Sequence, residues 1–126
     1  MSKKRILVID DEKNLCTVIK ACLENIGSWQ VLVAQSGSEG LAVAKSEHPD
    51  AILLDVMMPD INGMLLFQRL QENLTTNNIP VILLTAKVQT VDLKEFSQLS
   101  IAGVISKPFD PLRLSELVAN TLGWQF

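Results

Sequence analysis

The chain has 126 residues, of which 48% are hydrophobic and 20% charged, and its formal net charge is -3. This length and composition are typical of one globular domain with a sizeable core, and the negative charge argues against a nucleic-acid-binding surface. No stretch reaches the roughly 20 apolar residues of a membrane span. The N-terminal apolar run stops at Asp10 and Asp11, unlike a signal peptide. We therefore expect a cytoplasmic protein with one domain over residues 1–126 and nothing appended.

Short apolar runs alternate with helical patterns along the chain. The first half is expected to contain a strand over 4–10, a helix over 13–26, a strand over 29–34, a helix to about residue 47 and a strand over 51–55. Gly27 is expected to close the first helix. Ser36, three residues before Glu39, is typical of a capping box at the start of the second helix.

The second half repeats this alternation. Asn62 and Gly63 predict a turn before a helix that continues to about Leu74. A strand over 81–84, a weaker helical segment over 90–99, a strand over 101–106 and a last helix should follow. Asp110 and Pro111 predict the N-cap and first position of that last helix, and Gly123 its end. Its expected apolar face comprises Leu114, Leu117, Val118, Thr121 and Leu122.

Five strands alternating with five helices predict an α/β fold, a doubly wound five-stranded parallel sheet with helices on both faces. With strand order 2-1-3-4-5, a crevice opens between the first and third strands at the carboxyl edge, where such sheets bind ligands.

A carboxylate, hydroxyl or ammonium side chain stands at the end of four of the five predicted strands, whereas the second ends in Ala34 and Gln35 without a charged group. The first ends in Asp10 and Asp11, the third in Asp55, the fourth in Thr85 and the fifth in Lys107. Taken singly, these are ordinary residues: an N-cap, a turn residue, a strand end and a solvated lysine. Their common position beside one crevice predicts a functional site.

Carboxylates gathered in one crevice raise each other's pKa, and a hard divalent cation relieves this repulsion. Oxygen ligands, with no histidine or cysteine at the crevice, favour Mg²⁺ over zinc. A carboxylate oxygen of Asp55 could then attack phosphorus, because phosphoryl transfer needs mainly positioning and charge neutralisation. The Lys107 ammonium would neutralise charge, and the Thr85 hydroxyl would donate a hydrogen bond.

Four motifs carry a family resemblance: ILVIDDE (6–12), ILLDVMMPDING (52–63), PVILLTA (80–86) and SKPF (106–109). With them the chain resembles a response-regulator receiver domain, the CheY-like, flavodoxin-like phospho-acceptor of two-component signalling. The resemblance implies that Asp55 accepts phosphate from a sensor histidine kinase or a phosphotransfer protein. It also implies that Asp10, Asp11, Asp55 and the backbone carbonyl of Met57 bind Mg²⁺.

The same resemblance implies the route of the signal. Thr85 would bind a phosphoryl oxygen and move with it, Lys107 would pair with the phosphate, and the Lys107–Pro108 bond would be cis. The family often has Tyr or Phe three residues before the lysine as a switch aromatic. Here that position is Val104, so either the switch works differently or another side chain such as Phe109 takes part.

The expected output is a conformational change read by a separate protein, without nucleic acid or membrane as partner. The surface around the fourth helix, fifth strand and last helix is the expected place of this change, and homodimerisation there is an open alternative. Met57 and Lys87 lie two residues beyond Asp55 and Thr85, at positions that tune phosphate lifetime in the family.

Two rival functions are compatible with parts of the pattern. A phosphate-independent binding module is favoured only by Val104. A Mg²⁺-dependent phosphatase of the haloacid-dehalogenase type would need a general acid two residues after Asp55, where this chain has Met57. A flavin or nucleotide carrier lacks its Gly-rich phosphate loop after the first strand.

The remaining chemically active side chains have structural explanations. Cys16 and Cys22 share one helix at a separation too long for a disulfide, so we expect buried small hydrophobic side chains. His48 is expected to be solvated in a loop. Trp124 and Phe126 should pack the C-terminal tail, with a contact to a partner as the alternative.

Overall fold

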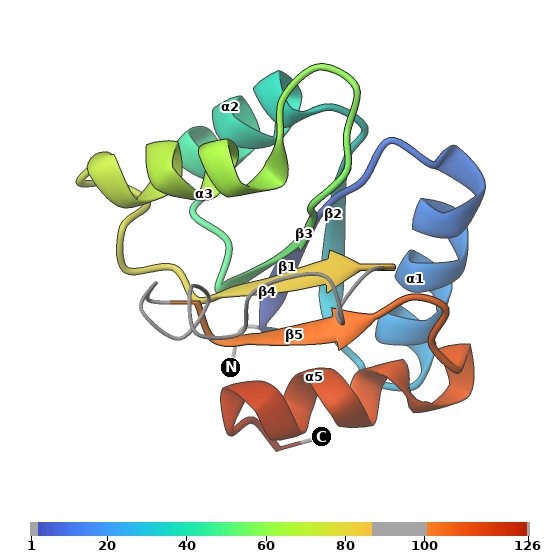
Figure 1. The fold of residues 1–126 in the computed structure, drawn as a ribbon. Coiled ribbons are helices and arrows are strands. Elements are labelled where there is room, and N and C mark those ends of the chain that lie inside the picture. The colour runs from blue at the N-terminus through green and yellow to red at the C-terminus, as the bar shows by residue number, and fades with distance from the viewer. Residues whose placement is uncertain (1–2, 87–100, 126) are drawn as a thin grey trace.

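Figure 1 shows a computed structural model that describes residues 3–86 and 101–125. Within these ranges the strands are β1 (Arg5–Ile9), β2 (Gln30–Ala34), β3 (Ala51–Asp55), β4 (Val81–Thr85) and β5 (Gly103–Ser106). The α-helices are α1 (Lys13–Asn25), α2 (Gly37–Glu47), α3 (Gly63–Glu72) and α5 (Leu114–Leu122), and a 3-10 turn, η2 (Pro111–Arg113), precedes α5.

The five strands form one all-parallel sheet in the order β2-β1-β3-β4-β5, as predicted. In its register Ile9 lies opposite Leu54, Asp55 opposite Leu84 and Thr85 opposite Ser106. The carboxyl ends of four strands therefore reach the same edge of the sheet, and the residues that follow them share one side of the molecule.

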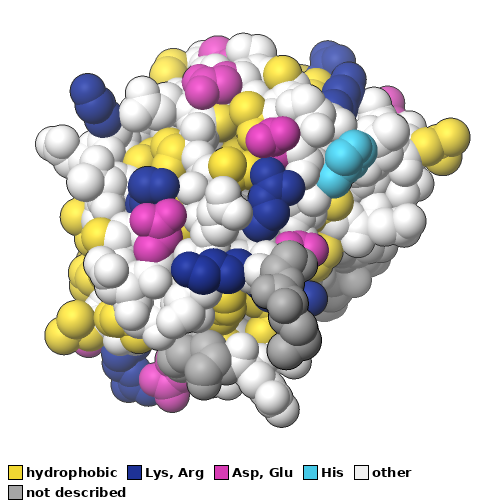
Figure 2. Space-filling model, turned by 180° about the vertical axis from the view of Figure 1, so that it is seen from behind, with side chains coloured by type: hydrophobic (Ala, Val, Ile, Leu, Met, Phe, Trp, Pro, Cys, Tyr) yellow, Lys and Arg dark blue, Asp and Glu magenta, His cyan; other side chains and the backbone are white. Residues whose placement is uncertain are grey.

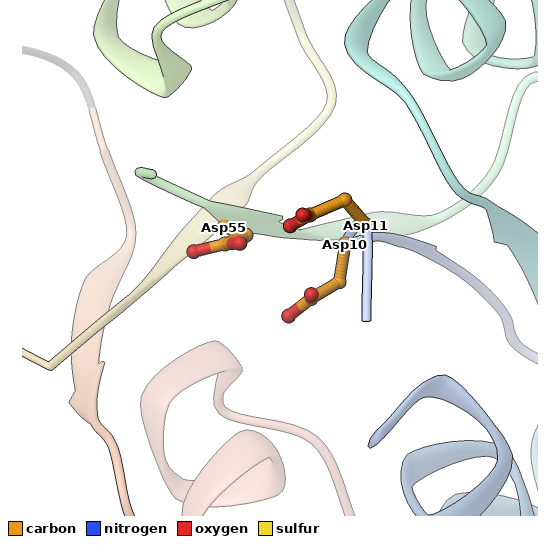
Figure 3. A group of neighbouring side chains, drawn as sticks. All are labelled: Asp10, Asp11 and Asp55. Carbon is orange, nitrogen blue, oxygen red and sulfur yellow. The ribbon is translucent and has the colours of Figure 1, made fainter. Parts of the chain in front are cut away.

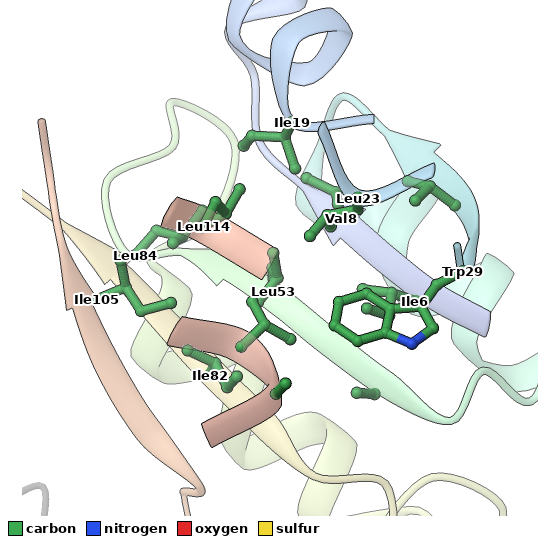
Figure 4. Packing of buried hydrophobic residues seen from close by; sticks show 14 of the residues in the cluster. Ile6, Val8, Ile19, Leu23, Trp29, Leu53, Ile82, Leu84, Ile105 and Leu114 are labelled. Carbon is green, nitrogen blue, oxygen red and sulfur yellow. The ribbon is translucent and has the colours of Figure 1, made fainter. Parts of the chain in front are cut away.

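Helices cover both faces of the sheet, with α2 and α3 on one face and α1 and α5 on the other (Figure 1). Alternate residues of each strand supply the two cores: Leu53 packs into the cluster with α1 and α5, and Leu54 into the cluster with α2 and α3. Figure 4 labels ten members of the first cluster: Ile6, Val8, Ile19, Leu23, Trp29, Leu53, Ile82, Leu84, Ile105 and Leu114.

Side-chain caps begin two of the helices where the sequence predicts them. The hydroxyl of Ser36 accepts a hydrogen bond from the Glu39 N–H at 3.2 Å. The Glu39 carboxylate accepts in return from the N–H of Gln35 rather than of Ser36, so the box closes one residue earlier than its usual form. Asp110 accepts from the Leu112 N–H at 3.0 Å.

Two helix predictions are wrong in detail. The third helix ends at Glu72, and Leu74 beyond it is 87% exposed, because the chain turns there with Thr76 donating to the Leu70 carbonyl. The last helix opens as a 3-10 turn and buries Leu114, Ser115, Val118 and Ala119, whereas Leu117 and Thr121 are exposed. Small side chains face inward because α5 packs closely on α1, where the Ser115 hydroxyl donates to the Cys22 carbonyl.

Several side-chain predictions are also tested. Cys16 is buried as expected, Cys22 is only half-buried, and both are free. His48 is exposed at the end of α2. Trp124 packs edge-on against Trp29 with ring centroids 5.5 Å apart, which confirms the predicted packing for Trp124.

Three predictions lie outside the described residues: the helix over 90–99, Lys87 and Phe126.

None of the helices in the described part of the chain is long and apolar enough to span a membrane. On the face seen in Figure 2, acidic and basic side chains lie interspersed rather than gathered by sign.

Candidate functional site

Three aspartates meet at the carboxyl edge of β1 and β3, as the strand order predicts. Asp10 and Asp11 follow β1, and Asp55 is the last residue of β3. One carboxylate oxygen from each lies within 4.8 Å of the others, and Figure 3 shows Asp11 extending toward Asp55 with Asp10 beside them. Asp10 and Asp55 are buried, whereas Asp11 is exposed. The cluster is therefore open to solvent on the side of Asp11.

Lys107 completes this cluster from the end of β5. Its Nζ lies 2.8 Å from Oδ2 of Asp10 and 3.4 Å from Oδ1 of Asp55. The Lys107–Pro108 peptide bond is cis. Burial alone would lower the pKa of this ammonium, but its hydrogen bond to Asp10 and the charges of Asp10 and Asp55 outweigh burial and raise the pKa. Lys107 is therefore a permanent cation between two buried carboxylates.

Asp55 has an unusual environment for a carboxylate. Burial, followed by the charge of Asp10, raises its pKa from 3.8 to about 6, although the Met57 N–H and Lys107 act in the opposite direction. The Met57 N–H donates to Oδ1 of Asp55 at 3.2 Å. The folded environment thus disfavours the ionised form of Asp55, and an added cation would stabilise that form.

Asp10 is oriented by contacts that the sequence did not predict. Its Oδ1 accepts from the Glu12 N–H at 2.9 Å, and its backbone carbonyl accepts from the Cys16 thiol at 3.2 Å. Burial, then the charge of Asp10, raises the pKa of Cys16 to about 11, which keeps the thiol protonated as a donor. No spacing signal reveals this role, because the partner of the thiol is a backbone carbonyl.

The donor set fits a hard divalent cation. Asp10, Asp11 and Asp55 offer oxygen ligands only, and their mutual repulsion is the interaction that such a cation relieves. Asp11 leaves one side accessible, which suits an ion that retains several waters. The chemistry of this cluster thus favours Mg²⁺ over a metal that prefers nitrogen or sulfur.

Thr85 and Val104 lie on neighbouring strands beside this cluster. Thr85 is buried at the end of β4, as predicted. Val104 is half-buried on β5 and packs against the core cluster on the α2 and α3 face. Val104 and Phe109 both line a cavity of about 380 Å³ beside α5, and Phe109 also lines a second cavity of about 340 Å³. The position of the expected aromatic is therefore occupied by an aliphatic residue that borders the first cavity.

Comparison with known proteins identifies the family. The family model described as response regulator receiver domain matches residues 6–119. Protein PilH of Pseudomonas aeruginosa is 37% identical over 118 residues, which are 94% of this chain and 97% of PilH. The chain spans only about half (49–52%) of the first curated relatives that it matches, which include probable transcriptional regulators.

Solved structures show the same fold. The chemotaxis protein CheY4 of Vibrio cholerae superimposes with a TM-score of 0.86 at 24% identity, over 95% of this chain and 99% of that protein. The receiver domain of the sensor histidine kinase PA1611 of Pseudomonas aeruginosa has a TM-score of 0.83 at 25% identity, over 97% of this chain and 99% of that domain. That structure has a magnesium ion coordinated in its active-site cleft.

Proposed function

Because the chain belongs to the response regulator receiver domain family of two-component signalling, we propose that residues 1–126 act as one receiver domain that takes up a phosphoryl group on Asp55. The observation that carries this proposal is the geometry around Asp55. A buried carboxylate at a strand end lies beside two further carboxylates and 3.4 Å from the Lys107 ammonium. That arrangement suits a nucleophile that must receive an anionic group.

The reaction is a transfer from a phosphohistidine of a sensor histidine kinase or a phosphotransfer protein. One carboxylate oxygen of Asp55 forms a bond to phosphorus as the P–N bond to the imidazole breaks, and the imidazole leaves with the electron pair and takes up a proton from water. The product on Asp55 is an acyl phosphate. The reaction requires Asp55 to be deprotonated, because a carboxylic acid is a poor nucleophile.

The surrounding side chains have separate roles in this proposal. Lys107 pairs with the incoming phosphoryl oxygens, and the Thr85 hydroxyl donates a hydrogen bond to one of them. Asp10, Asp11, Asp55 and the backbone carbonyl of Met57 would hold Mg²⁺. When bound, this ion would neutralise charge on the transferred oxygens.

The added phosphate is also the signal. It brings about 1.5 to 2 negative charges to a buried site at neutral pH. This charge draws Lys107 and Thr85 toward itself and so favours a second conformation, which a separate protein or a second copy of the chain reads on the surface around β5 and α5. Val104 cannot rotate a ring as a switch aromatic would, so we assign that part of the response to the packing beside the cavity that Val104 and Phe109 line.

Incubation with acetyl phosphate and Mg²⁺ tests the proposal. We expect one acid-stable, alkali-labile phosphoryl group per chain, visible as a mass increase in intact-protein mass spectrometry. EDTA should prevent the increase, and Asp55→Asn should abolish it. A control substitution at an exposed carboxylate, Glu72→Gln on α3, should leave it unchanged. An equal mass increase in Asp55→Asn would contradict the proposal.

A further inference from the structure

The loop between β3 and α3, residues 56–62, leaves the sheet directly after Asp55. The Val56 N–H still donates to the Leu84 carbonyl, and the Gly63 N–H closes the loop onto the Val56 carbonyl at 2.9 Å. Beyond Val56 the sheet no longer positions the backbone. Among the residues that the structure describes, the Met57 N–H donates to the Asp55 side chain, which is itself the proposed acceptor. A second contact is therefore needed to fix the position of this loop at the site.

Asp60, near the end of the loop, makes this second contact. Its Oδ1 accepts from the Gly37 N–H at 3.0 Å, and its Oδ2 accepts from the Ser38 N–H at 3.2 Å. Both N–H groups belong to the first turn of α2, where the helix leaves donors unsatisfied and favours negative charge. Both carboxylate oxygens are thus used in charge-assisted bonds to an element 22 or 23 residues away in the sequence.

The contact between this loop and α2 is also close in van der Waals terms. A Cβ on Gly37 would collide with Cγ2 of Ile61, the residue after Asp60. The helix in turn is packed on the site-bearing strand, because a Cβ on Gly40 would lie within 2.8 Å of Ile9 side-chain carbons. Ile9 directly precedes Asp10. The start of α2 therefore packs closely against both the strand that precedes one site carboxylate and the loop that follows the other.

We propose that Asp60 is a positioning residue of the phosphorylation site, which holds the β3–α3 loop against α2 and thereby sets the place of the Met57 backbone that would bind Mg²⁺. This inference rests on the proposed function, since it assigns Asp60 to the same site. Asp60 touches neither the phosphoryl group nor the ion. The Asp60 contacts limit the conformations of the loop before the ion binds, so that less conformational entropy is lost on binding.

Mg²⁺ titration of the metal-free protein by calorimetry tests the proposal, with acetyl phosphate as a second probe. Asp60→Ala should raise the Kd for Mg²⁺ about tenfold, at the low end of effects at residues that support metal ligands. Saturating Mg²⁺ should restore most of the phosphorylation rate, because the loop then starts from its bound place. Asp60→Asn keeps one acceptor oxygen and should give an intermediate Kd.

Ser36→Ala is the matched control. It removes the bond from the Glu39 N–H at the same end of α2 but leaves the loop untouched. Both alanine variants should lower the urea midpoint similarly, yet only Asp60→Ala should weaken Mg²⁺ binding. An unchanged Kd in Asp60→Ala and Asp60→Asn, or an equal weakening in Ser36→Ala, would overturn the assignment. Failure of the proposed function is distinct, because the wild-type chain would then gain no phosphate whatever the Mg²⁺ titrations show.

Discussion

At the scale of single residues, the main chemical feature of the candidate site is the buried carboxylate of Asp55. It is 3% exposed, lies near Asp10 and has its pKa raised to about 6, first by burial and then by that neighbouring charge. The nearby Lys107 ammonium lowers the free-energy cost of ionising Asp55 but does not cancel it. The chain thus keeps a partly destabilised carboxylate at the point where a strand ends.

The raised pKa sets the sign of a pH effect on stability. Below about pH 3.8 Asp55 is protonated in both the folded and unfolded states, and between about 3.8 and 6 the folded state alone holds the proton. Stability from this group therefore falls as pH rises through that window, and the full penalty is present at pH 7. We expect Asp55→Asn to raise the free energy of unfolding of the metal-free protein at pH 7 by about 3 kcal/mol, and by much less at pH 4.

Urea unfolding at the two pH values in EDTA measures this difference, and NMR titration of the Asp55 carboxyl should give an apparent pKa near 6. Glu72→Gln, which changes an exposed carboxylate, serves as the control. Added Mg²⁺ should lower the apparent pKa of Asp55, because a cation favours the charged form. An Asp55 pKa near 4 without metal would contradict the prediction.

At the scale of elements, the approach of α3 to the end of β3 depends on Gly63. A Cβ at this position would lie 2.6 Å from the Asp55 carbonyl oxygen and 2.6 Å from Cα of Val56. These neighbours are backbone atoms of the strand end and cannot turn aside as a side chain could. The first residue of α3 is therefore fixed by contact with the residue that carries the site.

We expect Gly63→Ala to destabilise the protein by roughly 2 kcal/mol or more, because the added methyl group must push α3 away from β3. Gly123→Ala is the matched control. Gly123 ends α5 with φ of +71°, and a Cβ added there would meet no atom within 4 Å, so its cost is only the left-handed backbone conformation, about 1 kcal/mol. Urea denaturation of both variants measures the difference, and an equal cost would show that crowding at Gly63 is relieved.

At the scale of the whole molecule, the sheet separates two hydrophobic clusters of the described residues, one on each of its faces. Leu53 and Leu54 are adjacent in sequence and fully buried, but they belong to different clusters. The α1 and α5 face and the α2 and α3 face therefore each depend on the central strand β3.

We expect Leu53→Ala and Leu54→Ala each to cost about 2–5 kcal/mol, because each deletes a buried side chain on one face. Leu74→Ala should cost less than about 0.5 kcal/mol, since Leu74 is 87% exposed. Denaturant unfolding of the three variants provides the measurement. A small effect of either core variant would show that one face contributes little to the fold.

Much of this organisation could be predicted from the sequence. The strands are short apolar runs bounded by turn residues, and alternation with helices leaves few topologies once right-handed crossovers are required. That reasoning places Asp10, Asp11, Asp55, Thr85 and Lys107 at one edge without knowledge of any contact. The residues at the strand ends can be predicted in this way because the end of each apolar run is visible in the local sequence. Parallel strands then bring their carboxyl ends to the same edge of the sheet.

Other features were decided only by tertiary packing. The inward face of α5 contains Ser115 and Ala119 instead of Leu117, because close contact with α1 selects small side chains. The thiol of Cys16 bonds to a backbone carbonyl, and helical spacing does not reveal such a partner.

By itself, therefore, the sequence determined the fold, the strand order and which polar residues lie at the carboxyl edge of the sheet. The tertiary structure decided how these residues are held: Lys107 between Asp10 and Asp55, and Asp60 on the first turn of α2. The physical reason is that hydrogen bonds between remote elements depend on how two faces pack, and no periodicity along the chain records that packing. The support of the site is thus a property of the folded chain.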